Sequence, residues 1–111
     1  MNRTDKEELI VTLLRKFIIP VDLGMKFDHA LELALESKEF EYAVAVKMIP
    51  EDSLKKAVLM AGQGGSLSEI LGQLDIFSEY DLQIINISQQ TGSEIKAMKA
   101  LIDFYEVTYG V

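Results

Sequence analysis

The stretch of residues 5–18, DKEELIVTLLRKFI, has the apolar spacing of a buried helix. Its apolar residues follow the four-residue spacing of one helix face at Leu9, Leu13 and Phe17. Others widen that stripe to most sides of the helix: Ile10, Val11, Leu14, Ile18 and Ile19. Such a helix lies either at the centre of a bundle or against a second copy of the chain, so Leu9, Leu13 and Phe17 are also candidate self-association residues. We expect Pro20 to end it, because proline lacks the N–H that a helix interior needs.

Helix starts elsewhere are marked by capping boxes, in which a Ser or Thr accepts a backbone hydrogen bond and a Glu three residues later reaches back. Three pairs have this spacing: Thr4 with Glu7, Ser66 with Glu69, and Thr91 with Glu94. Ser78 with Asp81 is a weaker start of the same kind. The glycines of residues 62–65 favour a left-handed turn after a helix, leading into the start at Ser66.

Together these signals predict one all-α domain over residues 1–111, a compact antiparallel bundle of about six short helices. The expected helices cover residues 5–18, 25–37, 39–49, 51–61, 66–74 and 79–90, and a last one follows Thr91. The last helix places Ile95, Met98, Leu101 or Ile102, and Tyr105 on one side. An α+β fold stays open as the alternative, with YAVAV (42–46) and LQIINI (82–87) paired as strands.

Composition narrows the classes of function. The chain of 111 residues has a formal charge of −7 and no basic stripe, which argues against nucleic acid and anionic lipid but suits a basic protein partner. It has no cysteine and no signal peptide, and no run of about 18 apolar residues, which a membrane-spanning helix would need. We therefore expect a cytoplasmic domain.

No residue pattern in the chain predicts catalysis or a bound cofactor. The single histidine, His29, precedes Glu32 in a His-x-x-Glu order and lacks the converging ligands of a metal site. The stretch GQGGS at 62–66 lacks the Lys-Ser/Thr that ends a phosphate-binding loop. We expect neither an enzyme nor a cofactor or metal site.

An acidic stripe on the second expected helix is the clearest candidate for binding. Asp28, Glu32 and Glu36 recur every four residues, opposite an inward face of Phe27, Leu31, Ala34 and Leu35. Like charges at this spacing destabilise a helix by a few tenths of a kcal/mol per pair. The stripe is either a solvated face or a docking face for a basic partner.

The order of motifs resembles a known family. Residues 61–107 are similar to the second half of the cytoplasmic domain of type II secretion F proteins and of the PilC-like platform proteins of type IV pili. The matching positions are Gly65, Ser66, Leu67, Glu69, Leu71, Phe77, Gly92 and the pair Phe104-Tyr105, with Gly24 in the first half. Residues 39–50, EFEYAVAVKMIP, form an insertion relative to that pattern.

The resemblance implies a six-helix, non-enzymatic domain at the cytoplasmic face of the bacterial inner membrane, forming the N-terminal piece of a longer membrane protein. The implied partners are the assembly ATPase, other inner-membrane pilus or secretion components, a second copy of the protein, and pilin subunits through the full-length protein. The expected role is to couple the ATPase to pilin extraction and polymerisation.

Two alternatives to the hypothesis of a platform-protein domain remain. One is a freestanding helical adaptor without a membrane tether, and the other is an acidic cation-dependent enzyme. The turn SQQTGSE (88–94) departs from the family, because Gln89 and Gln90 stand where relatives place acids and Ser88 replaces a glycine. Glutamine brings no charge, so an ion bridge at this turn is not expected.

Overall fold

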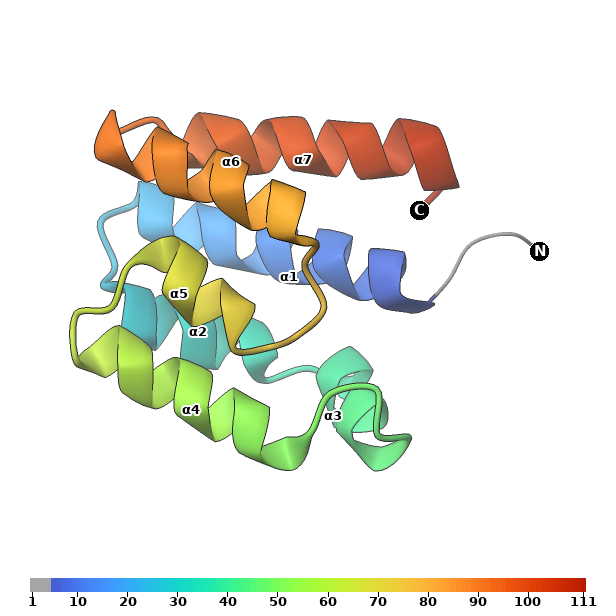
Figure 1. Cartoon of the computed structure of the whole chain (residues 1–111). Helices are drawn as coiled ribbons and strands as arrows, with labels where there is room; N and C mark the ends of the chain where they lie inside the picture. The colour runs from blue at the N-terminus through green and yellow to red at the C-terminus, as the bar shows by residue number, and fades with distance from the viewer. Residues whose placement is uncertain (1–4) are drawn as a thin grey trace.

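A computed structural model describes residues 5–111 of the chain (Figure 1). Within that range there are seven helices and no strand, which confirms the all-α fold and excludes the paired strands of the alternative. The helices are α1 (Asp5–Asp22), α2 (Phe27–Leu35), α3 (Lys38–Ala45), α4 (Glu51–Gly62), α5 (Leu67–Gly72), α6 (Glu79–Gln90) and α7 (Glu94–Tyr109).

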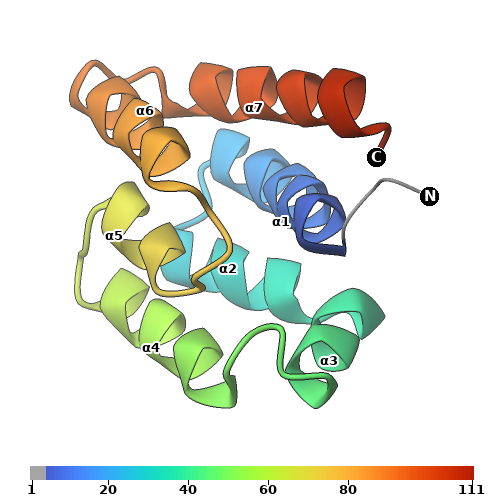
Figure 2. The ribbon, with the colours of Figure 1, turned by 45° about the vertical axis from the view of Figure 1, so that its right-hand side comes forward.

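Six of these helices form a closed series of packed neighbours. α1 packs between α2 and α7, α5 packs between α4 and α6, and the pairs α2–α4 and α6–α7 join the two groups. Figures 1 and 2 show the result as two layers, with α7, α1 and α2 in one and α6, α5 and α4 in the other. Packed neighbours run antiparallel, and α3 lies beside the layers at one end.

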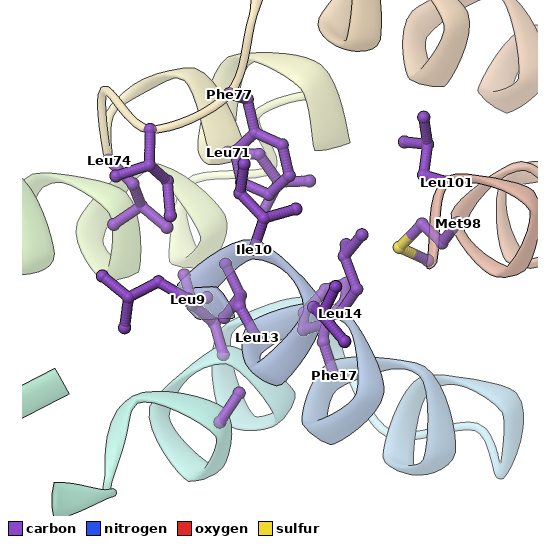
Figure 3. Packing of buried hydrophobic residues seen from close by; sticks show 14 of the residues in the cluster. Leu9, Ile10, Leu13, Leu14, Phe17, Leu71, Leu74, Phe77, Met98 and Leu101 are labelled. Atoms are coloured by element: carbon purple, nitrogen blue, oxygen red, sulfur yellow. The ribbon is translucent and has the colours of Figure 1, made fainter. Parts of the chain in front are cut away.

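α1 supplies the centre of the core. Leu9, Leu13 and Phe17 are at most 5% exposed, so almost none of their surface is available to a second copy of the chain. Except at Ile19, which is 65% exposed, the broad apolar stripe therefore serves the interior of one chain. Figure 3 shows Ile10 pointing toward Leu71 and Phe77, between the layers. The other buried residues of α1 are Val11, Leu14 and Ile18.

The expectation that Pro20 ends α1 is wrong, since the helix continues to Asp22. Proline lacks the N–H that would bond the carbonyl of Lys16 and its ring crowds that carbonyl, but both effects fall close to the helix end, two residues before Asp22. The backbone N–H of Met25 still donates to the Pro20 carbonyl at 2.9 Å. The chain reverses instead at Gly24, whose φ of +96° lies in the left-handed region.

Two of the predicted helix starts are confirmed. At α5 the Glu69 N–H donates to Ser66 Oγ at 3.3 Å and the Ser66 N–H donates to Glu69 Oε1 at 2.9 Å, which completes the capping box. The second bond lowers the pKa of Glu69. At α6 Ser78 Oγ accepts from the Asp81 N–H at 3.1 Å. Thr4, of the first predicted box, lies outside the described residues.

The third predicted box, Thr91 with Glu94, is wrong. Thr91 belongs to the end of α6, where its hydroxyl donates to the Ser88 carbonyl at 3.1 Å. Gly92 then takes a φ of +73°, and the Ser93 N–H donates to the same carbonyl at 2.8 Å. These groups are used to finish one helix, so Ser93 rather than Thr91 precedes α7.

Residues 39–45 are helical as predicted, but α3 is shorter than the expected helix over 39–49. It starts after Ser37, whose Oγ accepts from the Phe40 N–H at 3.4 Å, and it ends at Ala45. Lys47 then has a φ of +62°, an uncommon conformation for a residue with a side chain. That turn brings Ile49 into the core, where it is fully buried.

The glycine loop after α4 is a helix C-terminal turn, as predicted. Gly64 has a φ of +83°, and the Gly65 N–H donates to the Met60 carbonyl at 2.9 Å. A Cβ at Gly65 would lie 2.5 Å from Met60 Cγ and 3.1 Å from the Met60 carbonyl oxygen. Gly64 is thus required by backbone conformation, and Gly65 by close packing.

We expect Gly65→Ala to lower the free energy of unfolding by about 1–3 kcal/mol, because part of the clash is with backbone that cannot rotate away. The matched control is Gly62→Ala, whose Cβ would meet only Asp28 Oδ2 at an ordinary 3.7 Å. The control should be neutral or slightly stabilising, since alanine favours helix over glycine. Urea denaturation of both variants measures the difference; equal losses would contradict the packing explanation.

Candidate docking site along α2

The acidic stripe of α2 runs beside α4 and forms one rim of a groove. Glu32 and Glu36 are exposed and line a groove of about 480 Å³ between the two helices. Its floor is apolar because Leu35, Val58 and Leu54 are only partly buried by the core beneath them. Leu59, 61% exposed, and Lys55 complete the lining from α4.

Asp28 continues the stripe beyond the groove lining. Its Oδ2 lies 3.7 Å from the place that a Cβ would occupy at Gly62, the last residue of α4. Asp28 is half-buried, and its Oδ1 accepts a hydrogen bond from the His29 backbone N–H at 2.9 Å. Asp28 therefore belongs to the first turn of α2, where a negative charge stabilises the helix. Glu32 and Glu36 line the groove, whereas Asp28 lines a separate hollow with residues of the glycine turn after α4.

A second hollow lies at the corner between α1 and α2. It measures about 680 Å³ and is lined by Lys16, Ile19, Pro20, Leu23, Gly24, Met25 and Leu33. Leu23 is 83% exposed and Leu33 is 51% exposed. This hollow was not predicted from the sequence, because Ile19 was assigned to the core stripe and the helix was expected to end at Pro20. The sequence feature that could have indicated this hollow is Leu33, an apolar residue between two glutamates of the stripe.

The other candidates from the sequence lie apart from α2's groove. The His29 side chain is exposed, and no group of three or more potential metal ligands occurs within residues 5–111. The ion pairs Arg15–Glu106 and Lys16–Glu39 join α1 to α7 and α3. Neither ion pair includes Glu32 or Glu36, which line the groove.

The residues that carry the family resemblance mostly have structural positions. Leu67, Leu71 and Phe77 are buried, and Gly24 and Gly92 adopt positive φ at helix ends. The aromatic pair divides, because Phe104 is 54% exposed while Tyr105 is 6% exposed. Their rings meet edge to face with centroids 5.6 Å apart.

Tyr105 forms an interaction that the sequence analysis missed. Its hydroxyl donates a hydrogen bond to Asp81 Oδ2, and both residues are buried between α6 and α7. The sequence pointed only to Asp81 as part of a helix start, and nothing in the spacing of 24 residues links it to Tyr105. Burial, followed by this hydrogen bond, raises the pKa of Tyr105.

Gln89, in the turn SQQTGSE, has a structural role of its own. Its Oε1 accepts a hydrogen bond from the Leu67 N–H at 2.7 Å, which fastens the end of α6 to the first turn of α5. A glutamate at position 89 could accept the same hydrogen bond. The contact therefore does not depend on whether this side chain carries a charge. Gln90 is exposed.

Comparisons of the chain with models of protein families, with curated proteins and with solved structures found no match. Among residues 5–111, none of the helices combines the length and the hydrophobicity that crossing a membrane requires.

We expect Tyr105→Phe to lower the free energy of unfolding by about 1.5–3 kcal/mol at neutral pH, because Asp81 loses a buried hydrogen bond. A raised pKa means that the stabilising contribution of Tyr105 is complete below its unfolded pKa of about 10 and is lost as pH rises further. The native chain should therefore lose up to about 1.4 kcal/mol per pH unit more than the variant above that pH. Urea titrations from neutral pH upward test this, and parallel alkaline profiles would contradict it.

We expect Gln89→Ala to destabilise the fold by about 1 kcal/mol, since the Leu67 N–H loses its partner at a half-buried position. Gln90→Ala, next to it and exposed, is the control and should change stability by less than about 0.5 kcal/mol. Amide hydrogen exchange at Leu67 should accelerate only in the first variant. Unchanged protection of that amide would show that the bond does not hold α5.

Proposed function

We propose that this chain is a protein-docking domain of an inner-membrane platform protein, of the kind that serves type IV pilus assembly or type II secretion. The observation that carries the docking role is the surface of α2. Two hollows with apolar linings flank this helix, and they expose Leu33 on one side and Leu59 on the other. Exposed apolar surface rimmed by charge is typical of protein-binding sites.

The arrangement of the helices supports the platform assignment. Six helices form a closed ring in which each packs against two neighbours. α3 lies in the segment predicted as an insertion, and it makes no comparably extensive contact with any described helix. This agrees with a six-helix domain that carries an extra element between α2 and α4. The motif residues Ser66, Glu69 and Gly92 hold helix ends in this fold.

In this proposal the domain acts as a rigid adaptor and performs no chemistry. Its core keeps α2 packed against α4, and exposed side chains on these helices contact the partners. The complete platform protein would then transmit movement of the assembly ATPase to the membrane components that extract and polymerise pilin subunits. The domain itself would lie at the cytoplasmic face of the inner membrane.

Site-specific photo-cross-linking in cells that produce the complete protein tests the proposal. A photoreactive amino acid at Leu33 should form a cross-link to the assembly ATPase or to another inner-membrane component of the same machine, identified by mass spectrometry. The same group at Lys96, an exposed residue of α7, is the control and should not give that product.

Recovery of the complete protein outside the membrane fraction, with cross-links only to soluble proteins, would overturn the platform assignment and favour a freestanding helical adaptor. Equal cross-linking from Leu33 and Lys96 would contradict docking at α2.

A further inference from the structure

From the groove between α2 and α4 we infer the class of partner segment that the domain binds: a basic amphipathic helix. Its apolar face would cover Leu35, Val58 and Leu59, and its Lys or Arg residues would meet Glu32 and Glu36. This inference rests on the proposed docking function and adds the chemistry of the partner.

The spacing of the two glutamates fits a helical occupant. Residues four apart on a helix are separated by about 6 Å along the axis. A partner helix lying along the groove would present basic residues at i and i+4 with the same repeat, so both glutamates can be paired at once. An extended strand repeats its same-face side chains about every 6.6–6.8 Å and has no wide apolar face for the floor.

The acidic residues around the groove favour a bound segment of positive charge. The acidic rim belongs to α2, and Lys55 is the basic residue of the groove on the α4 side. The formal charge of −7 attracts a basic segment over long range and repels nucleic acid or anionic lipid. A bound helix would therefore carry its basic residues on the edge toward α2 and polar or acidic residues toward Lys55, which fixes its orientation about its own axis.

The apolar floor of the groove favours a bound helix that has one apolar face. Leu35, Leu54 and Val58 are already packed on the core from below, so they cannot turn away from the groove. Leu59 stands at the edge with 61% of its surface exposed. A partner without apolar side chains would leave this surface in contact with water, while one with leucines at helical spacing would bury it.

The test uses the full 111-residue chain and a fluorescent synthetic peptide of about 18 residues, long enough to form a helix. The peptide carries Leu along one face and Lys at four-residue spacing along one edge. Two comparison peptides replace every Lys with Glu, or keep the composition and scramble the order. Fluorescence anisotropy at near-physiological salt measures each affinity.

Two pairs of variants separate the groove from general effects. Glu32→Lys with Glu36→Lys reverses the rim, and Asp22→Lys with Asp103→Lys makes the same change of charge at exposed positions elsewhere. Leu59→Ser removes an apolar contact, and Ile87→Ser is its match, since the two side chains are 61% and 63% exposed. Circular dichroism and thermal unfolding confirm that all four fold.

We expect the basic amphipathic peptide to bind, the rim reversal to weaken it about tenfold or more, and Leu59→Ser to weaken it severalfold. The two control variants should stay within about threefold of the native chain. Equal loss in the rim reversal and its control, or binding of the acidic or scrambled peptide as tightly as the basic one, would overturn the inference. The inference would also be overturned if the chain self-associates and the rim reversal abolishes that self-association, because the groove would then hold a second copy.

The same variants distinguish failure of this inference from failure of the proposed function. The rim reversal can abolish peptide binding while the protein that carries it still cross-links to the assembly ATPase at Leu33 in cells. In that case the platform function stands, and the ATPase is not the partner that binds in the groove. If the peptide binds as expected and no component of a pilus or secretion machine is captured, the groove stands and the platform function fails.

Discussion

α1 is buried on most of its sides, so other helices must pack around it. Its buried side chains each contribute roughly 1.5–3 kcal/mol when they are removed from water, provided that other elements cover them. α2 follows directly along the chain, but α7 comes from the other end, so the fold must bring its two ends together. The connection through α4, α5 and α6 then forms the second layer (Figure 2).

Specific hydrogen bonds fix how the second layer sits on the first. The Tyr105–Asp81 bond holds α7 against α6, and the bond from the Leu67 N–H to Gln89 holds α6 against α5. The close approach at Gly65 then sets the angle at which the chain leaves α4. The groove between α2 and α4 lies where these two helices pack directly against each other.

Local chemistry in the sequence was sufficient to predict most elements, and long-range contacts explain what it missed. Apolar spacing predicted that α1 lies either at the centre of the bundle or against a second copy, and the Ser66–Glu69 box predicted the start of α5, since both patterns depend on neighbours along the chain. Thr91 also has the right spacing for a box, yet it is used to end α6, and spacing alone does not tell these roles apart. The Tyr105–Asp81 pair joins residues 24 apart, and the hollows exist only where separate helices meet.

The proposed partner of the groove would account for an unfavourable arrangement of charges on α2. In the free domain Glu32 and Glu36 repel each other by a few tenths of a kcal/mol, and Leu59 is exposed to water. Binding of a basic amphipathic helix would relieve both at once without any change of fold. The groove alone is small beside the roughly 1,000 Å² that a stable interface buries, so binding there would be weak and readily reversible. Leu33, between Glu32 and Glu36 in the chain, lines the second hollow, so a larger partner that crosses α2 can use both surfaces and bind more tightly than either permits alone.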